Sequence, residues 1–251
     1  MKKKILILAG LMMAWLPTAG FAQNEAELKA ALAKKFLNTP VDEVRATPIP
    51  GIYEVTSGKN IYYVEKNLRY LMFGGMIDSQ TGVNLTDARA QQLSRIDVST
   101  LPVKDAITWG SGKRHLYIFS DPDCPYCKKL HPELAKLRDV TIHLFLYPIK
   151  ELHPNAYYHG VAVWCSKDRK QALDDIFSGK PVEDAVCDNP VADNVSLGKK
   201  LGITGTPTLY FDDGSVQVGY ATAEAVQAKL EGNPATNVSG SIGGETKEAT
   251  R

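Results

Sequence analysis

The sequence predicts an α+β protein built from two domains behind a removable leader. Residues 51–73 contain three short runs of β-branched and aromatic residues separated by turn residues, which is the pattern of a β-meander. From residue 110 onward, strand-like and helix-like segments alternate, which indicates an α/β domain with a mixed sheet. The chain has 251 residues, 44% hydrophobic and 23% charged, so it can bury a core of its own. Its net charge of +1 provides no basic surplus for binding nucleic acid or an anionic membrane.

The first 22 residues have the features of a Sec-type signal peptide. Three lysines follow Met1, an apolar run covers residues 5–16, and small residues, Gly20 and Ala22, precede the expected cleavage site. The alternative is a membrane anchor, but the run is well short of the ~20 apolar residues that span a bilayer. We therefore expect an exported protein that does not insert into a membrane.

The N-terminal domain, residues 23–85, is predicted to be a helix followed by the β-meander. Apolar residues at helical spacing predict the helix over 23–36, with Asn24 as its N-cap. So small a sheet has little volume in which to hide both of its faces, and a partner is therefore expected. A helical pattern over 85–96 then predicts a connecting helix, and residues 86–109 are assigned to this linker.

Residues 110–232 form the second predicted domain. Strands are expected at 115–119, 140–147, 208–211 and 216–220, and helices at 125–138, 155–180 in two pieces, 193–201 and, capped by Thr222, up to residue 230. The last residues, 233–251, are Gly, Ser, Thr, Asn and charged residues with almost nothing apolar, so this tail is predicted to be disordered.

The segment that carries chemistry is a C-x-x-C motif, Cys124-Pro125-Tyr126-Cys127, between a predicted strand and a predicted helix. At a helix N-terminus, Cys124 lies near unpaired N–H groups and the positive end of the helix dipole, and both favour the thiolate. A lowered thiol pKa makes Cys124 a nucleophile and a leaving group, and we expect its sulfur to be uncovered. Cys127 lies one helical turn later and is expected to be the more buried, resolving thiol. A strand–C-x-x-C–helix context indicates redox chemistry.

A metal site is the alternative interpretation of this motif. Cys124, Cys127 and His131 would provide three ligands, whereas a structural zinc site has four, usually including a second close pair. Cys165 and Cys187 do not form such a pair, so neither a metal nor another cofactor is expected. His131 is then interpreted as an ordinary residue on the helix surface.

A second signal, Gly205-Thr206-Pro207, stands just before a predicted strand. A Pro that opens a strand behind Gly and Thr can follow a cis peptide bond, although base rates favour the trans form. The upstream C-x-x-C motif favours cis, since in a thioredoxin-like domain this loop faces the motif. The loop backbone would then bind an extended substrate segment by strand addition.

The two remaining cysteines, Cys165 and Cys187, are 22 residues apart and have two interpretations, a second redox pair or a structural disulfide. Four cysteines in an exported chain are consistent with two disulfides. A disulfide across this loop would stabilise the fold by at most about 3.4 kcal/mol through the unfolded state. Nothing around either residue resembles an activated thiol, which favours the structural disulfide.

In the order of its parts and in three motifs, the chain resembles the family of bacterial periplasmic disulfide isomerases that includes DsbC and DsbG. The motifs are Phe-Ser-Asp-Pro-Asp-Cys-Pro-Tyr-Cys-Lys-Lys-Leu-His at 119–131, Val-Trp-Cys-Ser-Lys-Asp at 163–168 with Cys187-Asp188, and Leu-Gly-Ile-Thr-Gly-Thr-Pro at 201–207. The resemblance extends from about residue 26 to residue 231. It implies a small cystatin-like β-meander dimerisation domain, a linker helix and a thioredoxin-like α/β domain. The chain would then form a homodimer with an apolar cleft between its two active sites.

The resemblance also implies roles for individual residues. Cys124 matches the attacking cysteine, Cys127 the resolving one, Pro207 the cis-proline, Thr206 the residue before it, and Cys165 with Cys187 the structural disulfide of DsbC. The implied activity is isomerisation or reduction of non-native disulfides in misfolded exported proteins in the periplasm, together with chaperone-like binding of those proteins. The implied partner is a membrane reductase similar to DsbD.

The dipeptide between the cysteines leaves the redox balance open. Here it is Pro125-Tyr126, as in DsbG, whereas the best-known DsbC has Gly-Tyr. The dipeptide tunes the stability of the dithiol relative to the disulfide. A thiol oxidase of DsbG-like or DsbA-like poise and a holdase chaperone with secondary redox activity are therefore the alternative functions.

Overall fold

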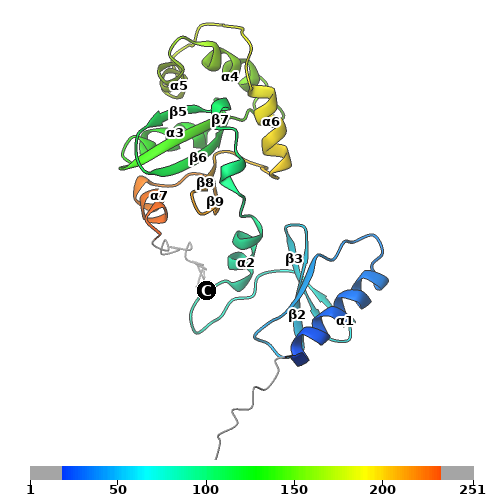
Figure 1. Ribbon diagram of the computed structural model, residues 1–251. Coiled ribbons are helices and arrows are strands. Elements are labelled where there is room, and N and C mark those ends of the chain that lie inside the picture. The colour runs from blue at the N-terminus through cyan, green and yellow to red at the C-terminus, as the bar shows by residue number, and fades with distance from the viewer. Residues whose placement is uncertain (1–18, 233–251) are drawn as a thin grey trace, which may run out of the picture. The chain divides into compact units, whose positions relative to one another are not determined.

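The computed structural model describes residues 19–232, and this part of the chain divides into two compact units between Leu93 and Ser94 (Figure 1). The predicted leader lies almost entirely outside the described residues, and the predicted disordered tail, 233–251, lies wholly outside them. Within the described part, no helix has both the length and the apolar character needed to cross a bilayer.

The first unit is built on a four-stranded antiparallel sheet in the order β1-β2-β3-β4. Its strands are β1 (Glu43–Ala46), β2 (Ile52–Ser57), β3 (Asn60–Glu65) and β4 (Leu71–Met72). Ser57 pairs with Asn60 across a two-residue turn in which Gly58 has a φ of +59°, a conformation that glycine adopts without strain. The meander expected over 51–73 is therefore present as β2, β3 and β4, and β1 precedes it.

Helix α1 (Ala19–Lys35) covers one face of this sheet and closes a small core (Figure 1). Its buried Leu28 and Leu32 pack against Val44, Val55 and other apolar residues of the strands. The helix begins before the expected start at residue 23, so Asn24 lies inside it, and its assignment as the N-cap was wrong. The expected cleavage site therefore falls within the described helix.

The linker differs from the expected helix over 86–109. Helix α2 (Leu85–Leu93) ends at Leu93, and two short 3-10 turns follow at Val98–Thr100 and Val103–Asp105. Strand β5 (Ile107–Gly110) then pairs with the sheet of the second unit. Because Ile107 is buried in that sheet, the second unit begins earlier than the expected residue 110.

The second unit has a five-stranded mixed sheet in the order β5-β7-β6-β8-β9. The remaining strands are β6 (Arg114–Ser120), β7 (Val140–Leu146), β8 (Thr208–Phe211) and β9 (Val216–Val218). Strands β6 and β7 are parallel and are joined through helix α3, whereas the other neighbouring pairs are antiparallel. The central strands are buried almost throughout, as their apolar composition requires.

Helices cover both faces of this sheet (Figure 1). They are α3 (Pro125–Leu134), α4 (Ala156–Cys165), α5 (Arg169–Phe177), α6 (Val191–Lys200) and α7 (Ala223–Leu230). One core contains apolar residues of α3, α4, α5 and α7, and the other contains Phe119 and Phe145 of the sheet together with residues of α6. The Thr222 side chain accepts a hydrogen bond from the Ala225 N–H, so the expected cap of α7 is confirmed. Because β6 is the central strand, the start of α3 lies at the C-terminal end of the two parallel strands, in the middle of the sheet.

Candidate active site

The C-x-x-C motif lies where the buried strand β6 gives way to helix α3. Ser120 ends the strand, and Cys124 is the N-cap residue of the helix, with extended backbone angles. Pro125 occupies the first helical turn, where its missing N–H group costs no hydrogen bond. Cys127 follows one turn later and is 2% exposed, so the two sulfurs lie at the start of one helix with Cys127 on its buried side.

The loop before β8 faces the motif. The Thr206–Pro207 peptide bond is cis. The sulfur of Cys124 lies 3.4 Å from the carbonyl oxygen of Thr206, to which it donates a hydrogen bond when the thiol is protonated. Residues 82 positions apart in the sequence thus meet at one sulfur. The structure therefore brings Cys124, Cys127, Thr206 and Pro207 together.

The surroundings of the two sulfurs push their pKa values in opposite directions. The pKa of Cys124 is lowered from 9.0 to about 5, first because the Cys127 thiol donates to its sulfur. The Thr206 side chain and the N–H groups of Cys127 and Tyr126 add to this effect, and burial opposes it. Burial raises the pKa of Cys127, and its hydrogen bond to Cys124 raises it further. At neutral pH the site therefore holds one thiolate and one thiol.

The exposure of Cys124 differs from the expectation of an uncovered sulfur. The residue is only 5% exposed, whereas the neighbouring Tyr126 is 61% exposed. The cover arises because Cys124 packs into the core of the second unit and its sulfur contacts Thr206. A substrate disulfide must therefore reach a recessed sulfur beside an exposed tyrosine ring.

The structure adds two carboxylate–imidazole pairs around the motif that the sequence did not reveal. His153 Nδ1 lies 3.0 Å from the carboxylate of Asp121, and His159 Nδ1 lies 2.6 Å from that of Asp123. Asp121 is fully buried, whereas Asp123 is partly exposed. Both acidic residues lie in the loop just before Cys124, and this position in the sequence was the one sign that they could belong to the site. Their partners, 32 and 36 residues away, could be found only from the fold.

His131 is not an ordinary surface residue, and that interpretation was wrong. Its side chain is 14% exposed, and its Nε2 lies 2.5 Å from Asp174 of α5. Burial lowers the pKa of His131, although Asp174 acts in the opposite direction. It lines a cavity of about 190 Å³ with Trp109 and Lys170. In the described residues, no three or more His, Cys, Asp or Glu side chains are grouped so as to hold a metal ion.

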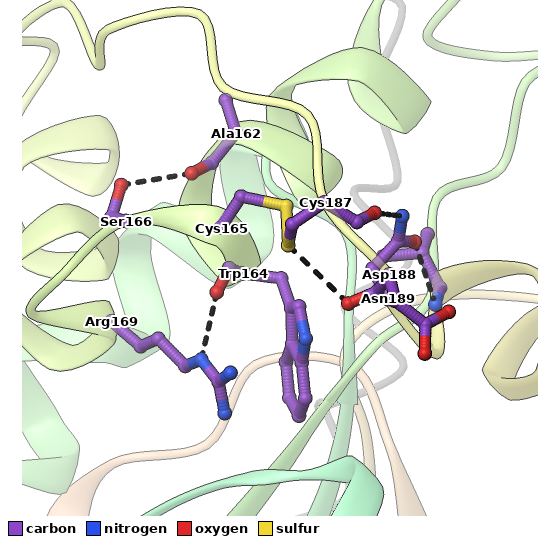
Figure 2. The surroundings of a disulfide bond; sticks show 9 residues. Ala162, Trp164, Cys165, Ser166, Arg169, Cys187, Asp188 and Asn189 are labelled. Atoms are coloured by element: carbon purple, nitrogen blue, oxygen red, sulfur yellow. Dashed lines mark hydrogen bonds between the residues drawn. A yellow bond between two sulfur atoms is a disulfide. The ribbon is translucent and has the colours of Figure 1, made fainter.

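Cys165 and Cys187 form a disulfide that joins the end of α4 to the segment before α6 (Figure 2). Their Cα atoms are 5.6 Å apart. Figure 2 shows Arg169 beside Trp164, and the guanidinium carbon of Arg169 lies 3.7 Å from the centre of the indole ring. The Arg169 Nε–H also donates to the carbonyl oxygen of Trp164 at 2.7 Å. The disulfide therefore fixes the C-terminal end of α4, the helix that also carries His159.

Comparisons with known families match both units of the chain. Residues 19–87 match a family described as the disulfide bond isomerase protein N-terminal domain. Residues 103–232 match a family described as the thioredoxin-like domain.

Individual relatives agree with these family matches. The chain is 37% identical over 202 residues to the probable thiol:disulfide interchange protein DsbC of Bordetella avium, covering 79% of this chain and 72% of that protein. It is 28% identical over 219 residues to the thiol:disulfide interchange protein DsbC of Escherichia coli, covering 85% of this chain and 90% of that protein. Among solved structures, a disulfide interchange protein from Neisseria gonorrhoeae is similar, with 41% identity and a TM-score of 0.50. The match covers 53% of this chain and 98% of that one.

Proposed function

The chain belongs to the DsbC family of thiol:disulfide interchange proteins, and on this premise we propose that Cys124 is its attacking thiolate and Cys127 its resolving thiol. The enzyme is a protein disulfide isomerase and reductase. The observation that carries the assignment is the contrast in acidity, with a pKa of about 5 for Cys124 and a raised pKa for Cys127. The thiolate is the nucleophile in disulfide exchange, so this contrast selects Cys124 for the first attack.

The reaction begins with attack of the Cys124 thiolate on one sulfur of a wrong substrate disulfide. A mixed disulfide forms and the other substrate sulfur leaves as a thiolate. When a substrate thiolate then attacks the mixed disulfide, a new substrate disulfide forms and the Cys124 thiolate is regenerated, so no electrons are gained or lost. When Cys127 gives up its proton and attacks instead, the substrate is released as a dithiol and Cys124–Cys127 becomes a disulfide. A membrane reductase similar to DsbD would then return two electrons.

Thr206 and Pro207 are proposed to bind the substrate backbone next to the reacting disulfide. The Thr206 carbonyl lies 3.4 Å from the Cys124 sulfur, so a peptide chain paired with this loop would present its own sulfur within reach. Pro125 and Tyr126 form the outer wall, and the exposed Tyr126 ring offers an apolar contact. Such contacts would also give chaperone-like binding of misfolded exported proteins.

The first unit is proposed to join two chains into a homodimer through strand β4. Both β1 and β4 are edge strands, but the exposed side chains of β1 include the charged Glu43 and Arg45. Around β4, by contrast, large apolar side chains are exposed: Tyr70, Leu71, Met72, Phe73, Ile77 and Val83. An apolar, unprotected edge is suited to pairing with the same edge of a second copy.

The proposed site of action is the periplasm. The lysine-rich apolar leader supports export, and the family acts on exported proteins. The disulfide between Cys165 and Cys187 is also typical of a protein that matures in an oxidising compartment.

Refolding of a protein with scrambled disulfides tests the assignment. Replacing Cys124 with Ser is expected to abolish reshuffling, because no thiolate can start the exchange. Replacing Cys127 with Ser is expected to preserve the first attack and to accumulate mixed disulfides that a non-reducing gel detects. Reshuffling by the Cys124→Ser variant would contradict the assignment. Trapping the wild type in cells mainly as the Cys124–Cys127 disulfide would favour an oxidase instead.

A further inference from the structure

The loop before Cys124 is organised around one buried carboxylate, that of Asp121. Its side chain is 0% exposed. It accepts hydrogen bonds from the Asp123 N–H at 2.8 Å, from the Ile149 N–H at 2.7 Å and from His153 Nδ1 at 3.0 Å. A buried carboxylate of this kind is stabilised only when such partners surround it.

The same residue is bound to both sulfur-bearing residues through its backbone. The Asp121 carbonyl oxygen accepts the N–H of Cys124 at 3.2 Å. The Asp121 N–H donates to the sulfur of Cys127. Asp121 is therefore anchored to the loop that carries both sulfurs, and Coulomb repulsion from its carboxylate would disfavour a second negative charge on Cys124.

His153 is the basic side chain that pairs with this carboxylate among the described residues 24–232. It lies in the segment between β7 and α4, where the His153 N–H donates to the Ile149 carbonyl oxygen at 2.9 Å, and its side chain is 23% exposed. The imidazole therefore connects a buried charge with solvent.

We propose that His153 is a positioning residue for the Cys124 nucleophile: its imidazolium, held on the buried Asp121 carboxylate, offsets that negative charge and so favours the thiolate. The inference rests on the proposed function, in which Cys124 makes the first attack. His153 acts through Asp121 and through its charge, without contacting the substrate sulfur. The Cys124 nucleophile is thereby linked to a residue of a different loop.

The charges that face His153 support this linkage. Asp121 and Asp123 lie in the loop before α3, Cys124 is at the start of that helix, and His159 of α4 pairs with Asp123. The hydrogen bond to Asp121 raises the pKa of His153, and the charges of Asp121, Cys124 and Asp123 act in the same direction, whereas burial opposes them. Linkage is reciprocal, so a thiolate that favours the imidazolium is equally favoured by it.

The pH profile of Cys124 alkylation in the reduced, full-length protein tests the proposal. The other three cysteines do not interfere, since Cys127 is buried with a raised pKa and Cys165–Cys187 is a disulfide. His153→Asn retains a donor near Asp121 but removes the charge. We expect this variant to raise the pKa of Cys124 by roughly half a unit to one unit, and so to slow iodoacetamide alkylation about threefold to tenfold below pH 5.

Two further variants separate a charge effect from a structural one. His159→Asn removes the neighbouring, more exposed imidazole, and we expect it to leave the Cys124 profile unchanged. His153→Ala removes both charge and donor, and we expect the same shift as for His153→Asn. An unchanged alkylation profile in His153→Asn overturns the proposal. A profile that shifts in His153→Ala but is of wild-type form in His153→Asn also overturns it, since the hydrogen bond to Asp121 would then suffice without the charge. Failure of the proposed function is distinguishable, because wild-type Cys124 would then not be alkylated at neutral pH.

Discussion

Two cysteines three positions apart have opposite acid–base properties in this fold, although both are buried at the start of one helix. Cys124 receives hydrogen bonds from Cys127 and from backbone N–H groups, whereas Cys127 faces the core. The surroundings of the motif therefore separate the acidities of two neighbouring thiols, as the proposed roles of nucleophile and resolving thiol require. This separation makes the stability of the reduced protein depend on pH.

The pKa of Cys124 is lowered from 9.0 to about 5 on folding, so the thiolate stabilises the folded state above the unfolded pKa. This contribution is lost as the pH falls toward 5. The oxidised protein has no thiol at this position. We therefore expect the Tm of the reduced protein to fall relative to that of the oxidised protein on acidification from about pH 8.5 to pH 5.

Differential scanning calorimetry of both redox forms measures this difference. In the reduced Cys124→Ser variant the dependence on pH is expected to disappear over the same interval. Cys127 does not cancel the effect there, because a raised pKa costs stability only above the unfolded value of a thiol. A constant difference between the two forms in the wild type would contradict the lowered pKa of Cys124.

The residues of the site could be predicted from the sequence only where the signal was local or matched a known motif. The C-x-x-C motif and the Gly-Thr-Pro loop are contiguous, and each has a distinctive composition. The pairing of Asp121 with His153 depends on how β7 leads back past the start of α3, and no local pattern records it. Exposure of Cys124 was also mispredicted, because the cover comes from Thr206, far along the chain.

At the scale of elements, α6 packs on the sheet at a point that only a glycine permits. A Cβ atom on Gly198 would lie 2.3 Å from the ring of Tyr147, which is buried and donates its hydroxyl to the Ile203 carbonyl oxygen at 2.9 Å. Gly198→Ala is therefore expected to destabilise the protein by about 1–3 kcal/mol, measured by urea unfolding. Gly160→Ala in α4 is the control, because its new Cβ would have no neighbour nearer than 3.7 Å. An equal loss in both variants would contradict the packing argument.

The elements themselves were predicted best where composition changes sharply. Strands β6, β7 and β8 consist mainly of buried apolar residues, and α7 has its own cap, so these were found close to their limits. Strand β1 was missed because Glu-Val-Arg-Ala has a single buried side chain. The linker was overextended because Ile107–Gly110 becomes a strand only by pairing with β7, which is distant in sequence.

The edge strand β4 gives a prediction about assembly. Phe73 is 76% exposed beside β4, and we expect Phe73→Glu to convert the proposed homodimer into a monomer, since charges at an apolar edge oppose pairing. Leu37→Glu is the control, because Leu37 is 84% exposed in the same unit but follows α1 in the chain and is not one of the exposed residues around β4. Sedimentation velocity at micromolar concentration measures both. A dimeric Phe73→Glu protein, or a monomeric Leu37→Glu protein, would place the interface elsewhere.

At the scale of the whole molecule, catalysis and assembly are assigned to different units. The C-x-x-C site is complete within residues 94–232, and both faces of the five-stranded sheet are covered by helices of the same unit. We expect this fragment to fold as a monomer that still reduces insulin disulfides but reshuffles scrambled substrates poorly, because it lacks the partner surface that would hold them. Activity assays beside sedimentation test this. A fragment that dimerises, or that rearranges substrate disulfides as well as the full protein does, would contradict the assignment of catalysis and assembly to different units.

The disulfide between Cys165 and Cys187 must form during maturation of the enzyme itself. A newly made chain carries four thiols, and four thiols can be joined pairwise in three ways, of which one leads to the mature arrangement. The immature chain is thus itself a substrate for disulfide rearrangement before it can act as a catalyst. Mature copies of the enzyme can rearrange the disulfides of a newly made copy whose first disulfide joins the wrong cysteines, so the enzyme would catalyse its own maturation.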